Sequence, residues 1–165
     1  MDEVYTVTSE SGDEYKLQFT SDRSGVIADA LLDFLADRGI EVVEIGLARV
    51  KGHNVTSHYV LAKIEECIAD LMQRHPNAIL SFFCDFIHFV PSHKQIPVQE
   101  YRSRLFSAMF NRYVAQHHLH EFCNHVVEVE GVSEHFYFHV IYRKEHEVFA
   151  DMIAEGHQND FGKPD

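Results

Sequence analysis

Histidine is unusually frequent in this chain, with 13 among 165 residues, so a metal site has to be considered. Three of them, His125, His135 and His139, fall in two adjacent segments that read as strands. If residue 125 pairs with residue 139, strand alternation puts the rings on one face of a hairpin. A register shift of one residue would separate them. Because the sequence has no HExxH or similarly spaced zinc motif, we expect no stoichiometric metal and no cofactor, and these three histidines remain metal candidates only.

A second group with chemical potential follows the apolar run 78–84. Cys84 and Asp85 end this run, and ligands of open α/β sheets tend to bind beyond the carboxyl ends of strands. Cys84 could act as a nucleophile if His88 or His93, in the following loop, served as its base. In the alternative, which we favour, Cys84 packs in the core and Asp85 caps or pairs with an arginine such as Arg102.

The three cysteines, Cys67, Cys84 and Cys123, predict free and mostly buried thiols in a reducing compartment, because their number is odd and no CxxC pair occurs. The chain begins Met-Asp-Glu, without the basic and apolar regions of a secretory signal. No apolar run approaches the ~20 residues that span a bilayer. We therefore expect a cytoplasmic protein.

The charge balance is strongly acidic. Lys and Arg number 14 against 26 Asp and Glu, which gives a formal net charge of -12. A negative field repels phosphate backbones and acidic lipid headgroups, and no basic stripe offsets it here. We expect no nucleic-acid partner and no membrane partner.

Periodicity predicts the elements that position these residues. Alternation predicts a β-hairpin over 4–20, β-branched residues predict a strand over 40–50, and a second hairpin spans 122–143. The run 78–84 is nearly all apolar, which predicts an interior strand with neighbours on both edges.

Helical spacing of apolar residues predicts four helices. The first follows cap candidates at 21–24 and ends near Gly39, and the second is capped by Ser57. The third spans 99–118 and a short fourth begins near Val148. The resulting order, ββ-α-β-α-β-α-ββ-α, predicts an α+β fold in which helices pack on a mixed sheet of about six strands. We expect a single domain over 1–156 and a flexible polar tail over 157–165.

Over nearly its whole length, the chain resembles a family of small bacterial proteins known only as a domain of unknown function. The likeness rests on the opening hairpin segment 15–20, the strand ending Phe82-Phe83-Cys84-Asp85, the helix segment 102–106 and the closing aromatic hairpin. In that family a Ser-Asp-Gly stretch follows the Cys-Asp pair, whereas residues 86–90 stand here instead. The resemblance implies no established activity.

From Glu14 onward, the element order also resembles a reduced GCN5-related N-acetyltransferase, although two strands usual in that family are missing. The family's pyrophosphate loop reads Arg/Gln-x-x-Gly-x-Gly/Ala; Arg49 and Gly52 match it and Asn54 departs from it. The resemblance implies acetyl-CoA binding at this loop, with Tyr113 as general acid toward the departing thiolate. On this hypothesis, we expect Gly52→Val to abolish cofactor binding with little loss of fold stability.

Two functions therefore remain open. The first is a cytosolic non-catalytic or uncharacterised interaction module that works through a protein partner or self-association. The alternative is a divergent acyl-CoA-dependent N-acyltransferase that uses the loop Arg49–Asn54. The sequence does not establish whether the protein is an enzyme.

Overall fold

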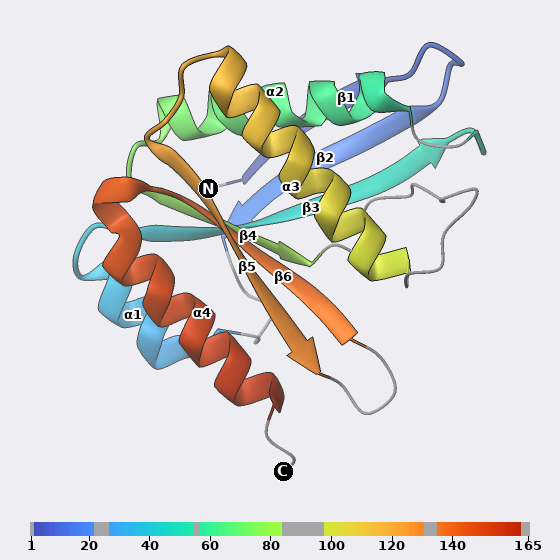
Figure 1. Ribbon diagram of the computed structural model, residues 1–165. Coiled ribbons are helices and arrows are strands. Elements are labelled where there is room, and N and C mark those ends of the chain that lie inside the picture. Colours follow the sequence, from blue (N-terminus) through green and yellow to red (C-terminus); the bar gives the residue numbers. More distant parts are fainter. Residues whose placement is uncertain (1, 22–26, 55–56, 84–97, 131–134, 163–165) are drawn as a thin grey trace.

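A computed structural model describes residues 2–21, 27–54, 57–83, 98–130 and 135–162 of the chain (Figure 1). The strands are β1 (Asp2–Thr8), β2 (Glu14–Ser21), β3 (Glu41–Lys51), β4 (Ala78–Phe83), β5 (Phe122–Glu130) and β6 (His135–Arg143). The helices are α1 (Asp29–Ala36), α2 (His58–Arg74), α3 (Val98–Gln116) and α4 (Glu147–Gly162), and a 3-10 turn, Lys144–His146, precedes α4. This order confirms the predicted α+β fold.

The strands form one mixed sheet in the order β1-β2-β3-β4-β6-β5. Only β3 and β4 are parallel, and the other neighbouring strands are antiparallel. Strand β4 lies between β3 and β6, which confirms the predicted interior strand over the described part of 78–84. The two outer strands are β1 and β5.

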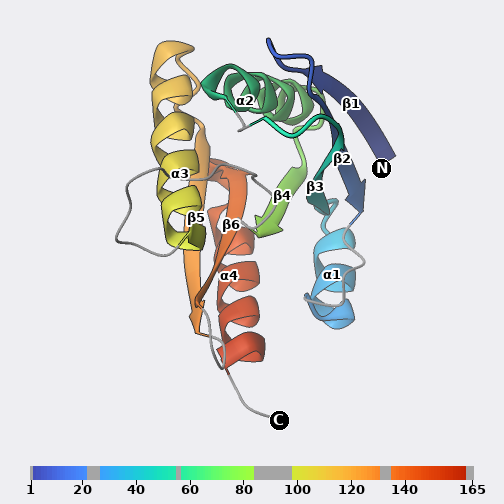
Figure 2. The same cartoon turned by 90° about the vertical axis from the view of Figure 1, so that its right-hand side faces the viewer.

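Helices cover both faces of the sheet, α2 and α3 on one and α1 and α4 on the other (Figures 1 and 2). Strand alternation builds a separate apolar core under each pair. Tyr15, Leu17 and Phe19 of β2 are fully buried beneath α2, whereas Val127 and Val140 belong to the core beneath α1 and α4. Burying a large apolar side chain stabilises the fold by roughly 1.5–3 kcal/mol, so these two layers hold the sheet and helices together.

Helix starts agree with the sequence in one case and differ in another. The Ser57 hydroxyl accepts a hydrogen bond from Val60 N at 3.3 Å, which confirms the predicted cap of α2. Helix α1 begins only at Asp29, after Ala28, whose side chain makes no capping bond. Ser21, a predicted cap candidate, instead ends β2 and donates its hydroxyl to Glu41.

Helix α4 extends to Gly162 and so includes the first part of segment 157–165. The predicted flexibility of that segment stays a prediction. Among the described residues, no helix has the length and apolar character needed to cross a bilayer.

Candidate functional site

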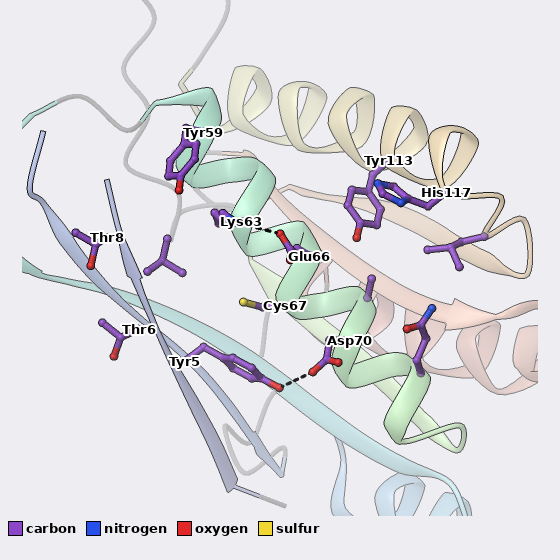
Figure 3. Close-up of a pocket in the computed structure, with 14 residues that line it drawn as sticks. Tyr5, Thr6, Thr8, Tyr59, Lys63, Glu66, Cys67, Asp70, Tyr113 and His117 are labelled. Carbon is purple, nitrogen blue, oxygen red and sulfur yellow. Dashed lines mark hydrogen bonds and ion pairs between the residues drawn. The ribbon is translucent and has the colours of Figure 1, made fainter. Parts of the chain in front are cut away.

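A groove of about 760 Å³ runs along the outward face of α2 (Figure 3). Helix α2 forms its floor, the outer strand β1 forms one wall, and the C-terminal end of α3 forms the other. The lining residues are Tyr5, Thr6, Val7 and Thr8 on β1; Tyr59, Lys63, Glu66, Cys67, Ala69, Asp70 and Gln73 on α2; and Tyr113, His117 and Leu119 at the α3 end.

The amphipathic pattern of α2 decides which side chains reach the groove. Val60 and Ile64 belong to the apolar stripe that packs on the sheet and are buried. Tyr59, Lys63 and Asp70 follow at spacings of four and seven on the side of the helix next to this stripe, where Tyr59 and Asp70 are exposed and Lys63 is partly exposed. The stripe that attaches α2 to the sheet therefore also fixes the floor of the groove.

A polar cluster joins β1 to the last turn of α2 at one end of the groove. The Tyr5 hydroxyl donates to Asp70 Oδ2 at 3.2 Å, and Arg74 also bonds to that hydroxyl. Arg74 pairs with Glu3 at 2.7 Å and with Asp70 at 3.0 Å. His75 Nε2 lies 2.8 Å from a Glu3 carboxylate oxygen. Because most of these groups are exposed, each pair adds little stability, but together they fix the position of β1 beside α2.

The pKa values in this cluster follow its contacts. The hydrogen bond from Arg74 lowers the pKa of Glu3, with a smaller effect of the same sign from His75. Desolvation raises the pKa of Tyr5 to about 12. Both groups therefore keep one protonation state around neutral pH, Glu3 as a carboxylate and Tyr5 as a phenol.

Farther along the groove, the Cys67 side chain points toward β1, and Tyr113 lies on the other side of α2, at the α3 wall (Figure 3). The Tyr113 ring stacks on His117, with 4.1 Å between ring centroids. Desolvation raises the pKa of the Cys67 thiol and that of the Tyr113 phenol. A raised thiol pKa leaves little thiolate, so this cysteine is not an activated nucleophile.

The two parts of the predicted acyl-CoA site, Tyr113 and the loop Arg49–Asn54, lie apart along α2. Tyr113 lies level with Cys67 on α2, and the loop that precedes α2 ends at Ser57. At a rise of 1.5 Å per residue, the ten residues between these levels place Tyr113 about 15 Å along the helix from the loop. This separation is compatible with the predicted roles, because Tyr113 is expected to act on the departing thiolate, which lies at the far end of the pantetheine arm from the pyrophosphate.

The loop Arg49–Asn54 already binds a negatively charged side chain from another part of the chain. The Asp13 carboxylate, from the β1–β2 turn, accepts hydrogen bonds from Asn54 N and Asn54 Nδ2, both at 3.0 Å. Arg49 Nη1 lies 3.9 Å from the same carboxylate. Asp13 is 2% exposed, so this contact is a buried tie between the two turns. Arg49, Gly52 and Asn54 do lie together, as predicted, but around Asp13.

This arrangement corrects one expectation. Gly52 has φ +95, and a Cβ built on it would overlap the Asp13 carboxylate. The expectation that Gly52→Val would cost little fold stability is therefore wrong, because the valine would have both a disfavoured backbone conformation and a clash with a buried side chain.

The two parallel strands separate toward their carboxyl ends. Strands β3 and β4 pair only from Glu41–Ala78 to Glu44–Ser81, although β3 continues to Lys51 beside β2. The last residues of β4, Phe82 and Phe83, pair with β6 (Figure 1). Among the described residues, the sheet thus opens between β3 and β4, beside the loop that leads to α2.

Two of the histidine candidates, His125 and His139, do not share a face of the sheet. The hairpin pairs His125 with Val140 and Val126 with His139, so the register differs by one residue from the pairing of 125 with 139 that a shared face requires. His125 therefore faces α4, with its Nδ1 3.7 Å from Asp151, and His139 lies on the opposite face under α3. His135 is in β6, paired with Glu130. Within the described ranges, no group of three or more His, Cys, Asp or Glu side chains could hold a metal ion.

His139 instead belongs to a buried polar chain. Its Nε2 lies 2.9 Å from Ser103 Oγ, and its Nδ1 lies 2.9 Å from Asn124 Oδ1. The Asn124 amide donates to Ser107 Oγ, which leaves Oδ1 as the acceptor. His139 Nδ1 must therefore carry the proton, and Ser103 donates to Nε2. Burial lowers the pKa of His139 to about 3, so the ring is neutral.

The hydrogen bonds from Ser103 through His139 to Asn124 resemble those of a serine nucleophile and its base. The burial of these side chains, however, favours a structural role. Ser103 is 3% exposed and His139 is fully buried, with its ring stacked on Phe82 at 4.8 Å. A substrate cannot reach the hydroxyl in this arrangement. The chain of hydrogen bonds attaches α3 to β5 and β6 through groups that would be costly to leave unpaired.

Of the remaining candidates, Cys84 and Asp85 lie outside the described residues, as do His88 and His93. Cys67 and Cys123 are free, as predicted, although each is half-buried rather than mostly buried. The proposed pairing of Asp85 with an arginine is likewise outside the described part.

The sequence did not indicate the groove. Its two walls come from residues about 100 positions apart, and only its position in the sheet order makes β1 an outer strand. The exposed stripe of α2 was available as a signal, since it is the complement of the predicted buried stripe. No protein-family model, no curated protein and no solved structure matches the chain.

Proposed function

We propose that the protein is a cytosolic, non-catalytic interaction module that binds an extended segment of another polypeptide along β1. The observation that carries this proposal is an outer strand beside the groove that lacks charge after its first two residues, Asp2 and Glu3. Residues 4–8 of β1 read Val-Tyr-Thr-Val-Thr, without charge or proline. Natural outer strands usually carry lysine, proline or a bulge to prevent pairing with other chains. Their absence from this segment favours pairing as its function.

The hydrogen-bond pattern of the hairpin identifies the groups that would bind. Ser9 N donates to Asp13 O, directly across the turn, at 2.8 Å. Because bonded and non-bonded pairs alternate in antiparallel strands, the same register makes Tyr5 and Val7 bond inward to β2. The backbone N–H and C=O groups of alternate residues, Val4, Thr6 and Thr8, then point outward.

Side-chain alternation supplies the specificity of such a site. Tyr5 and Val7 face α2, while Val4, Thr6 and Thr8 lie on the other face and are exposed. An added strand would extend the sheet, and its alternate side chains would enter the groove between β1 and α2. Backbone bonds would give affinity, and the groove would select side chains.

Photo-cross-linking in the cells that make the protein tests the proposal. A photoreactive residue replaces Val4 on β1, which is 58% exposed, or Val148 on α4, which is 61% exposed and serves as the matched control. We expect a discrete adduct from position 4 and not from position 148, whether the captured chain is a second copy or a different protein. Equal or absent adducts at the two positions would contradict the proposal.

A divergent acyl-CoA-dependent acyltransferase is the second candidate. The opening between β3 and β4 favours it. The Asp13 carboxylate opposes it, because it occupies Asn54 N and places a negative charge where a pyrophosphate would bind. We expect millimolar acetyl-CoA to leave the melting temperature unchanged. A saturable rise of several degrees would reverse the order of the two candidates.

A further inference from the structure

We infer that the segment bound along β1 is β1 of a second copy of this chain, paired antiparallel about a two-fold axis at Thr6. This inference rests on the proposed function and names its occupant. The two sheets would join into one continuous sheet, with both α2 helices on the same face. Closed two-fold dimers of this kind use one surface patch twice, so the patch has to be complementary to itself.

Residues 4–8 of β1 are complementary to themselves about Thr6. Antiparallel pairing there sets Thr6 against Thr6, Tyr5 against Val7 and Val4 against Thr8. Aromatic with β-branched and threonine with threonine are favourable cross-strand pairs. The residues whose backbone groups point outward, 4, 6 and 8, would face one another, and about six inter-chain hydrogen bonds would form.

Helix α2 has a matching symmetry. It runs antiparallel to β1, and the contact of Tyr5 with Asp70 sets their relative position. One strand residue advances about 3.3 Å and one helical residue 1.5 Å, so Thr6 lies level with about residue 68 of α2. The two-fold axis at Thr6 therefore also passes near the middle of the α2 face in the groove.

Antiparallel approach of the two α2 helices about that level pairs opposite charges. Lys63 of each copy comes within reach of Asp70 of the other, and Tyr59 comes near Arg74 of the other. All four side chains are substantially exposed, and Lys63, Asp70 and Arg74 would have to exchange part of their present ion pairs, with Glu66 and Glu3 among others, for contacts with the second copy. Cys67, which lines the β1 side of the groove, lies close to the axis in both copies.

The charge of -12 on each copy opposes association. Salt screens repulsion between net charges more than it weakens close contacts, so we expect the dimer to tighten between about 20 and 150 mM salt. A partner of opposite charge would bind more weakly as salt rises, so the sign of the salt effect separates the two occupants.

Sedimentation equilibrium of the purified full chain tests the inference. We expect wild type to dimerise and Thr6→Ala, which keeps the N–H, to do the same. Thr6→Pro removes the outward N–H without breaking a bond to β2, a position where outer strands tolerate proline. It should remove both bonds on the axis and weaken the dimer about 30-fold, with circular dichroism unchanged.

A flexible bismaleimide that reaches across the two-fold axis should cross-link the wild-type dimer through Cys67 and fail with Cys67→Ser. Wild type that stays monomeric at both salt concentrations would overturn the inference. A dimer whose dissociation constant is unchanged by Thr6→Pro would also overturn it. An adduct from Val4 with a different protein, beside a monomeric pure chain, would leave the proposed function standing and reject only this occupant.

Discussion

Glu65 is a buried carboxyl group whose replacement should make the protein more stable at neutral pH. It lies on the sheet side of α2, is 6% exposed, and its Oε1 has no hydrogen-bond partner among the described residues. The small cavity beside it is lined by apolar side chains such as Phe110 and Val114, and among the described lining residues Tyr113 is the only other titratable one. Burial raises the pKa of Glu65 to about 8.

The magnitude follows from linkage. The folded pKa lies above the unfolded value of 4.5, so the full contribution to stability is present below pH 4.5 and is lost as the pH rises toward 8. At 1.36 kcal/mol per pKa unit, the loss between pH 5 and pH 7.5 is about 3 kcal/mol. Glu65→Gln keeps the volume and removes the titration. The variant should therefore match wild type at pH 5 and exceed it at pH 7.5.

Urea unfolding at both pH values, followed by circular dichroism, measures the difference. The control is Glu66→Gln, on the next residue, whose side chain is exposed and should leave the pH dependence unchanged. Stability curves for wild type and Glu65→Gln that stay parallel from pH 5 to pH 7.5 would refute the reasoning, because the carboxyl would then titrate alike in both states.

Two further stability predictions concern buried ties. Gly52→Ala should lower the free energy of unfolding by at least about 1 kcal/mol, since φ is +95 and the new Cβ would displace the Asp13 carboxylate; Gly12→Ala, at a positive-φ glycine with open space, is the control that isolates the clash. Equal losses in the two variants would show that the Asp13 contact adds nothing. Asn124→Ala should cost about 1–3 kcal/mol, because His139 Nδ1 would lose its acceptor while staying buried. A variant as stable as wild type in thermal unfolding would mean that the polar chain does not hold α3 in place.

The element order could be predicted because each element carries its own periodic signal. The apolar run 78–84 predicted the interior strand, and Ser57 followed by a clean stripe predicted α2 and its cap. These signals are local, so each can be recognised from the sequence of its own segment. The start of α1 was missed because Ala28, an unremarkable residue, occupies the cap position.

The site could not be predicted in the same way, because it depends on pairings between distant segments. The observed register differs by one residue from the assumed one, so His125 and His139 lie on opposite faces of the sheet. His139 therefore takes part in a buried chain of hydrogen bonds and not in the predicted metal site. The contact of Asp13 with Asn54 joins residues 41 positions apart, and no local sequence pattern predicts it. Likewise, β1 is an outer strand only because of the order of the complete sheet.

Residue-resolved amide hydrogen exchange on β1 tests strand addition most directly. It compares the free chain with the complex that forms through β1, either the dimer or the adduct captured from Val4. In the free chain, the inward amides of Tyr5 and Val7 should be protected and the outward amides of Val4, Thr6 and Thr8 should exchange rapidly. In the complex, the three outward amides should become protected as well. Outward amides that exchange equally fast in both states would contradict the assignment of β1 as the binding strand.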